Sequence, residues 1–185
     1  MKKKFYAIIG NPVAHSLSPI LHNYWFKKYN IEAHYSLLCV KENDLKDTVQ
    51  KIRNKELDGI NVTLPYKEKI IQFIDRLVND AQFTNSVNTV FLNEDDILVG
   101  ENTDVFGLQA AYLKGILNTE KKKALVIGAG GVSPSVIFSL QKSKIQNVSI
   151  LNRTLEKSIL LKKRFKFLNI LEWSSLEKKL NEQRV

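Results

Sequence analysis

The stretch Ala124-Leu125-Val126-Ile127-Gly128-Ala129-Gly130-Gly131 decides the fold of the second half of the chain. Four apolar residues, a glycine-rich turn and a further apolar segment predict a buried strand, a tight loop and a helix. Glycines in such a loop let backbone N–H groups approach a pyrophosphate at the helix N-terminus. The stretch therefore favours a dinucleotide-binding unit. Ser133 stands where a third glycine would be, so a glycine-rich turn without a ligand is the alternative.

The next predicted strand, 148–151, is followed by Asn152-Arg153-Thr154. In such units an acidic residue at this edge binds the ribose 2′-hydroxyl, whereas an arginine accepts a 2′-phosphate. No carboxylate stands at this edge, and Arg153 offers a planar, permanent cation beside the Thr154 hydroxyl. These residues predict NADP rather than NAD as the cofactor, with an ordinary surface arginine as the alternative.

Strand and helix patterns alternate along the chain, which predicts an α/β protein. Strands are expected at 5–9, 34–40, 59–64, 86–92, 97–100, 124–127, 148–151 and 170–171. Helices are expected at 18–30, 43–52, 70–77, 104–117, 154–165 and 176–180, and from the glycine loop to 142. The aromatic residues 24–26 are expected in the core. We place a domain boundary near Thr103.

Three polar strings stand in the first half, where predicted strands meet loops or helices. They are His15-Ser16-Leu17-Ser18-Pro19, Asn61-Val62-Thr63-Leu64-Pro65-Tyr66-Lys67, and Asn88-Thr89 followed later by Gly100-Glu101-Asn102-Thr103-Asp104. Ligands of open α/β sheets bind outside the carboxyl ends of the strands. The strings are therefore candidates for a ligand site.

Taken in order, the polar strings, Gly-Ala-Gly-Gly and Asn-Arg-Thr closely resemble the motifs of the shikimate dehydrogenase family, from Phe5 to about Phe165. The resemblance implies an N-terminal three-layer αβα substrate-binding domain, 1–103, followed by a partial Rossmann-type NADP-binding domain, 104–185. It also implies an oxidoreductase of aromatic amino acid biosynthesis, the chorismate pathway. That enzyme reduces 3-dehydroshikimate to shikimate with NADPH.

The resemblance also implies roles for single residues. The implied catalytic pair is Lys67 and Asp104. The residues implied to bind the substrate carboxylate and hydroxyls are Ser16, Ser18, Thr63, Lys67, Asn88 and Asp104, with Asn102 in the same network. The residues implied to bind the cofactor are Gly128, Ala129, Gly130, Gly131, Asn152, Arg153 and Thr154. Taken alone, Lys67 would be a surface lysine and Asp104 a helix cap.

Two features depart from the family pattern. Lys157 stands where the family usually has a second arginine, so the charge is kept but the bidentate fork is lost. The chain ends at Val185, too soon after Gly128 for a complete doubly wound nucleotide domain or for the family's terminal helix, which supplies a glutamine to the substrate. We therefore expect a fragment with weak or absent activity and a less stable second half. A quinate/shikimate dehydrogenase, a non-catalytic shikimate- or nucleotide-binding remnant, and a homodimer are left open.

Composition limits the other classes of function. Hydrophobic residues make up 44% of the chain and charged residues 25%, a globular mix. The net charge of +9 arises in 120–185, where 14 basic residues face 5 acidic ones; no DNA- or RNA-binding string accompanies it, so we expect no nucleic acid partner. The single Cys39 and the scattered histidines predict no disulfide framework and no metal site. No apolar run approaches the ~18 residues that span a bilayer, so we expect a soluble, cytoplasmic protein with no membrane partner.

Overall fold

Six strands form one mixed sheet in the first half of the chain, in the order β2-β1-β3-β5-β6-β4. The arrangement comes from a computed structural model, which describes residues 2–116 and 119–181. The strands are β1 (Lys4–Gly10), β2 (Ala33–Cys39), β3 (Gly59–Val62), β4 (Arg76–Leu77), β5 (Thr89–Leu92) and β6 (Leu98–Glu101). β1 is parallel to β2 and β3, and the predicted hairpin β5–β6 is antiparallel. Because β5 also pairs antiparallel with β3, it begins where β3 ends.

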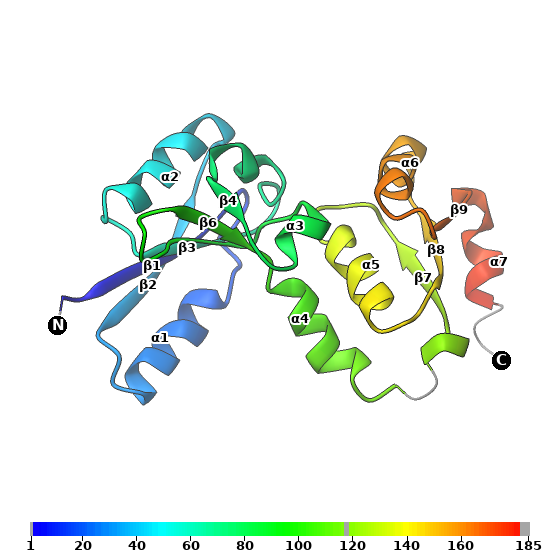
Figure 1. The fold of residues 1–185 in the computed structure, drawn as a ribbon, viewed down its shortest axis with the longest axis horizontal. Coiled ribbons are helices and arrows are strands. Elements are labelled where there is room, and N and C mark those ends of the chain that lie inside the picture. Colours follow the sequence, from blue (N-terminus) through cyan, green and yellow to red (C-terminus); the bar gives the residue numbers. More distant parts are fainter. Residues whose placement is uncertain (1, 117–118, 182–185) are drawn as a thin grey trace. The chain divides into compact units, whose positions relative to one another are not determined.

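Helices cover both faces of this sheet, as Figure 1 shows for α1 (Ser18–Lys28) and α2 (Leu45–Arg53). Side chains of β1 alternate between the two faces, since Ala7 and Ile9 belong to the larger core and Ile8 packs with Val13 and Tyr35 in a smaller one. The larger core also contains buried side chains of α2, β3, β5 and β6: Leu45, Val49, Ile52, Ile60, Val62, Val90 and Leu98. The three-layer αβα arrangement that was predicted is confirmed.

The helix predicted at 70–77 is wrong. A short 3₁₀ helix, Lys69–Phe73, is followed by extended backbone at Ile74 and by β4, which pairs with β6. The Asp75 carboxylate accepts hydrogen bonds from Arg53 (2.7 and 2.9 Å) and from the Leu98 N–H (2.9 Å). These contacts with α2 and β6 hold the segment as an edge strand, so tertiary contacts outweigh a helical apolar pattern.

The prediction that residues 24–26 lie in the core is wrong for two of the three. Tyr24 is 58% exposed and Trp25 41%, whereas Phe26 packs against the smaller core beside Tyr6. α1 begins with Pro19 in its first turn, as predicted, but the Ser18 hydroxyl does not cap it. The helix ends at Lys28, two residues before the predicted end.

The second half contains a parallel sheet in the order β7-β8-β9. Its elements are α4 (Asp104–Leu108), which a π-helical turn (Gln109–Leu113) continues, β7 (Lys123–Ile127), α5 (Ser133–Lys142), β8 (Asn147–Leu151), α6 (Leu155–Arg164), β9 (Asn169–Leu171) and α7 (Leu176–Asn181). The helix expected to reach 117 is thus shorter, and its last residue lies outside the described residues. The strand–helix alternation is one half of a doubly wound nucleotide fold, and the α/β prediction is confirmed here too.

The chain divides into two compact units, 1–103 and 104–185. The second unit has a core of its own, which includes Ile137, Val148, Ile150 and Leu168. A short 3₁₀ turn (Thr119–Lys121) precedes β7, and α3 (Ala81–Thr84) precedes β5 in the first unit. Among the described residues, no helix is both long and apolar enough to cross a membrane.

Candidate active site

The ends of β1 and β3 are joined so closely that Gly10 is required between them. The Thr63 N–H donates to the Ile9 carbonyl (2.9 Å), and the Asn11 N–H donates to the Leu64 carbonyl (3.0 Å). A Cβ on Gly10 would lie 2.6 Å from Thr63 Cγ2 and 2.9 Å from the Leu64 oxygen. Both loops contain a cis X-Pro bond, at Asn11-Pro12 and Leu64-Pro65. The backbone therefore presents Thr63 at the carboxyl end of the sheet.

Ser16 and Ser18 are brought together just before and at the start of α1. Their hydroxyl oxygens are 3.1 Å apart, and the Ser18 N–H donates to Ser16 Oγ (3.3 Å). The Ser16 N–H in turn donates to the Val13 carbonyl, which fixes the loop after β1. Both serines are half-buried. Two hydroxyls that each donate and accept can bind a carboxylate or a hydroxylated ring here.

Lys67 is only 7% exposed, although an isolated lysine at a loop would be expected at the surface. Its carbonyl accepts the Val87 N–H (2.8 Å), which ties the loop after β3 to the segment before β5. The preceding Tyr66 is buried, and its hydroxyl donates to the Val40 carbonyl (2.7 Å). These contacts hold the lysine in place, and a buried ammonium needs polar or anionic neighbours.

Asn88 and Asn102 organise the crossing from the sheet into α4. The Asn88 side-chain oxygen accepts the Thr103 N–H (3.0 Å), and its amide nitrogen donates to Thr103 Oγ1 (3.0 Å). Asn102, 3% exposed, donates to the Ser86 carbonyl (2.7 Å). Asp104 follows Thr103 directly and begins α4 in the second unit. Its pairing with Lys67 of the first unit stays a prediction.

The predicted glycine loop closes on itself between β7 and α5. Gly128 has a positive φ of 106°, a backbone conformation that favours glycine over residues with a Cβ. Gly130 has no such requirement, and a Cβ on it would meet no atom within 4 Å. Packing within the described chain therefore does not require Gly130, and a loop kept bare on its outer side fits the close approach of a phosphate group. The Ser133 hydroxyl accepts the Gly130 N–H (3.0 Å) and donates to the Gly128 carbonyl (2.9 Å). Ser133 thus braces the loop from the position of the missing third glycine.

Asn152 connects the glycine loop to the end of β8. Its side-chain oxygen accepts the Ala129 N–H (3.0 Å), and its amide nitrogen donates to the Thr154 carbonyl (2.7 Å). The structure thus gives Asn152 a bracing contact that sequence reasoning did not foresee. Arg153 and Thr154 are exposed beside it, and within the described part of the chain Arg153 pairs with no carboxylate. A guanidinium placed there is available to an anionic ligand.

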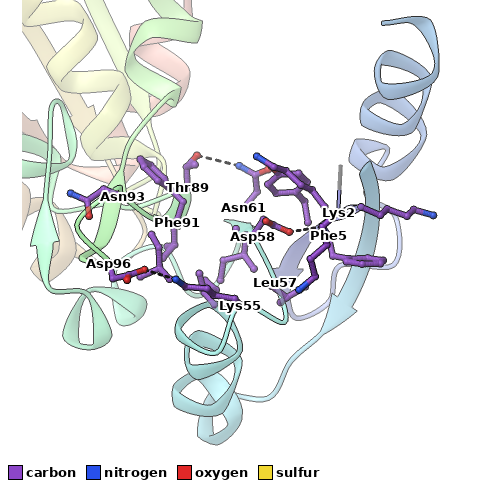
Figure 2. Close-up of a pocket in the computed structure, with 18 residues that line it drawn as sticks. Lys2, Phe5, Lys55, Leu57, Asp58, Asn61, Thr89, Phe91, Asn93 and Asp96 are labelled. Atoms are coloured by element: carbon purple, nitrogen blue, oxygen red, sulfur yellow. Dashed lines mark hydrogen bonds and ion pairs between the residues drawn. The ribbon is translucent and has the colours of Figure 1, made fainter. Parts of the chain in front are cut away.

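A cavity of about 940 Å³ lies at the amino ends of β1 and β3, and sequence reasoning missed it. Figure 2 shows its rim, where Lys55 pairs with Asp96 (2.8 Å) and the Asp58 carboxylate accepts the Phe5 N–H (2.8 Å). Asn61 and Thr89, which hydrogen-bond each other, line the same cavity. The sequence holds one signal for this: Asn61 is polar between the apolar Ile60 and Val62, so it lies on the opposite face of β3. Among the described residues no cluster of side chains could hold a metal ion.

Comparison with known proteins agrees with this geometry. The sequence model described as the shikimate dehydrogenase substrate binding domain matches residues 8–90, and the model described as shikimate / quinate 5-dehydrogenase matches 111–185. The chain belongs to the shikimate dehydrogenase family. A relative from Pelagibacter ubique, named shikimate dehydrogenase (NADP(+)), is 43% identical over 92% of this chain and 64% of its own length.

Solved structures show the same family fold. Shikimate dehydrogenase from Aquifex aeolicus matches with a TM-score of 0.84 and 35% identity, over 91% of this chain and 62% of that one. The enzyme from Thermus thermophilus in complex with NADP(H) and shikimate matches with a TM-score of 0.79 and 34% identity, over 91% and 62%. The chain therefore spans less than two thirds of the length of each of these relatives.

Proposed function

We propose that this chain carries the substrate site and part of the NADP site of an NADP-dependent shikimate dehydrogenase, which reduces 3-dehydroshikimate to shikimate. The observation that carries the proposal is a buried lysine, Lys67, in the loop that follows β3 and Thr63, next to the segment that Asn88 organises. A small hydroxylated acid needs many fixed donors and acceptors, and the first unit offers them at one end of its sheet. The relative in complex with NADP(H) and shikimate supports the same ligands.

In this proposal different polar residues bind different groups of the substrate. Ser16, Ser18 and Thr63 bind the carboxylate and a ring hydroxyl, and the Asn88 amide binds another hydroxyl. Asn102, which donates to the Ser86 carbonyl, supports the site rather than touching the substrate. A site built to bond hydroxyls rejects analogues that lack them, because its buried polar groups would be left unpaired.

Lys67 and Asp104 are proposed to handle the proton of the reacting hydroxyl. The Lys67 ammonium donates a hydrogen bond to the carbonyl oxygen and stabilises the negative charge that develops there. Lys67 then supplies the proton that completes the hydroxyl. The Asp104 carboxylate accepts a hydrogen bond from this hydroxyl and orients the Lys67 ammonium. The proton belongs to the pair rather than to either residue.

The glycine loop of the second unit is proposed to hold the cofactor. Gly128 to Gly131 would receive the pyrophosphate, with Asn152 holding the loop in shape. Arg153 and Thr154 would bind the 2′-phosphate that distinguishes NADP from NAD. When bound, the reduced nicotinamide supplies the hydride.

We also propose a cytoplasmic location, because a free, exposed thiol such as that of Cys39 suits a reducing compartment. A homodimer is a further proposal, which sizing chromatography tests.

Two measurements on the chain as it exists test the function. Calorimetry should detect shikimate binding, weakened for an analogue without the ring hydroxyls. NADPH absorbance should fall slowly or not at all when 3-dehydroshikimate is added, because the chain carries only part of the proposed NADP site. Binding of shikimate without turnover would mean that the chain binds the substrate but does not catalyse the reaction. Equal affinity for quinate would mean that quinate is also a substrate. No binding of shikimate at all would overturn the proposal.

A further inference from the structure

The Tyr35 hydroxyl lies at the start of a chain of hydrogen bonds inside the first unit. Tyr35, on β2, is 3% exposed, and its hydroxyl donates to the Asn61 side-chain oxygen over 2.6 Å. A buried phenol needs a partner, because an unpaired hydroxyl in an apolar environment is costly. Its partner here is the side chain of Asn61 on β3, so the hydrogen bond connects β2 to β3.

Each bond in the chain fixes the direction of the next one. Because Asn61 Oδ1 accepts from Tyr35, Asn61 Nδ2 is turned toward Asn88 and Thr89, and donates to the Asn88 carbonyl and to Thr89 Oγ1 (3.1 Å each). The Thr89 hydroxyl accepts that hydrogen bond and donates its own O–H to Asn88 Oδ1 (3.0 Å). Figure 2 shows the Asn61–Thr89 step.

The chain ends on the Asn88 amide and fixes which way it faces. Oδ1 accepts from Thr89 and from the Thr103 N–H, and Nδ2 donates to Thr103 Oγ1 (3.0 Å). The Thr103 hydroxyl also lies 3.2 Å from Oδ1, so Thr89 and the Thr103 N–H are the contacts that distinguish the two ends of the amide. An asparagine amide can turn over and exchange its donor for its acceptor, so its orientation must be set by neighbours. Thr103 is the residue immediately before Asp104.

α1 holds the tyrosine from the other side. Asn23 accepts the Tyr35 N–H (2.9 Å) and donates to the Tyr35 carbonyl (2.8 Å), which satisfies the backbone of the edge strand. The His22 ring stacks on the Tyr35 ring at 4.3 Å with an interplanar angle of 5°. His22 and Asn23 of α1, the helix that begins at Ser18, therefore hold Tyr35 in place.

We propose that Tyr35 is a positioning residue of the substrate site: through Asn61 and Thr89 it sets the orientation of the Asn88 amide and holds the Thr103 backbone. The proposal rests on the proposed function for the role of Asn88 toward substrate, and on the hydrogen bonds alone for the orientation. Phenylalanine would pack as well as tyrosine but would start no chain. The hydroxyl, not the ring, is thus the group that matters.

The first experiment follows backbone amides by NMR hydrogen exchange in the unliganded chain. Tyr35→Phe should speed exchange of the Thr103 amide by about tenfold, the effect of one lost hydrogen bond. The Leu98 amide, held by Asp75 elsewhere in the same sheet, should not change. Tyr6→Phe is the matched control, because Tyr6 is the register partner of Tyr35 on β1. Unchanged exchange at Thr103, or equal acceleration at Leu98, would overturn the proposal.

The second experiment tests whether Tyr35 and Thr89 act along one path. Tyr35→Phe and Thr89→Val should each weaken shikimate binding about tenfold. The affinity of the double variant should be no lower than that of the weaker-binding single variant. Fully additive losses would mean two independent effects and would overturn the path. If the parent chain bound no shikimate, the proposed function would be overturned. Faster hydrogen exchange of the Thr103 amide in both Thr89→Val and Tyr35→Phe would still support the path of hydrogen bonds that orients Asn88.

Discussion

Lys67 is the residue on which the proposed chemistry depends most. We predict that Lys67→Ala lowers turnover about 10²- to 10⁴-fold, the range for a positioned proton donor, while shikimate binding stays detectable. The physical reason is that its interaction with the developing alkoxide is strongest in the transition state. If the chain itself shows no turnover, the substitution is made in a longer version of the enzyme. Initial rates of NADPH oxidation and calorimetry measure the two quantities separately.

A lysine two positions further on supplies the control. Lys69 is exposed and pairs with Glu42, so Lys69→Ala should leave turnover near normal and cost at most about 1 kcal/mol of stability. Equal effects of the two substitutions, or near-normal turnover in Lys67→Ala, would contradict the catalytic assignment. Asp104→Asn should behave as Lys67→Ala does, because in the proposed function the two residues handle one proton.

Arg153 is predicted to separate the two nicotinamide cofactors. Arg153→Ala should weaken NADP binding by about 1.5 to 3 kcal/mol, the value of hydrogen bonds to a charged group, and leave NAD binding nearly unchanged. Lys163→Ala removes one exposed positive charge from α6 and should change neither affinity by more than a small amount. Fluorescence titration with both cofactors is the measurement, and equal losses for NADP and NAD would show that Arg153 does not contact the 2′-phosphate.

Tyr35 is predicted to make the first unit sensitive to alkaline pH. Burial raises the pKa of Tyr35 from 10.0 to about 12. Between these values the folded chain binds more protons than the unfolded chain, so stability falls as pH rises from 10 to 12, by on the order of 1–2 kcal/mol. Urea unfolding at several pH values should show this fall, and Tyr35→Phe should remove that part of it. An identical pH dependence in both proteins would contradict the assignment.

The residues that the sequence could predict differ in kind from those it could not. Ser16, Ser18, Thr63 and Lys67 lie in short strings whose order along the chain is itself the signal, and the structure places them in the segments that follow β1 and β3. The path from Tyr35 to Asn88 depends on strand register, which puts Tyr35, Asn61 and Thr89 on one face. Register is set by pairing between distant segments and is not written in any one of them.

At the scale of elements, the junction of β1 and β3 is the most constrained feature of the first unit. Gly10→Ala should destabilise the first unit by about 1–3 kcal/mol and weaken shikimate binding, because the new Cβ would clash with Thr63 and the Leu64 backbone. Chemical denaturation with calorimetry measures both effects.

Gly107 offers the opposite case in the same chain. It lies inside α4, and a Cβ there would meet no atom within 4 Å. Gly107→Ala should therefore stabilise the second unit by about 0.5–1 kcal/mol through helix propensity. If both glycine substitutions changed stability in the same direction, the close approach at Gly10 would not be the cause.

Prediction of elements succeeded where local chemistry and tertiary contacts agree. The hairpin β5–β6 follows from two apolar runs around a polar turn, and the structure confirms it. The segment 70–77 failed because Asp75, a single polar side chain, contacts Arg53 and Leu98 from other elements. α1 likewise has an apolar pattern, but Tyr24 and Trp25 remain at its surface, while His22, Asn23 and Phe26 contact residues of β1 or β2.

At the scale of the whole molecule, the main hydrophobic core of each unit is built from a separate part of the sequence. The larger core of the first unit contains residues between 7 and 98, and the core of the second contains residues between 113 and 168. The proposed ligands divide in the same way, because the serines and Thr63 belong to one unit and the glycine loop to the other. Each unit can therefore be stabilised by its own ligand.

We predict that the chain unfolds in two thermal transitions that respond to different ligands. A ligand that binds only the folded state, at one hundred times its Kd, stabilises that state by about 2.7 kcal/mol. Shikimate should therefore raise one transition and NADP the other, and scanning calorimetry with each ligand alone and with both resolves them. Lys67→Ala should leave the NADP response intact, and Arg153→Ala should leave the shikimate response intact. A single transition raised equally by either ligand would show instead that the two cores unfold as one cooperative unit, in which each ligand stabilises residues that it does not touch.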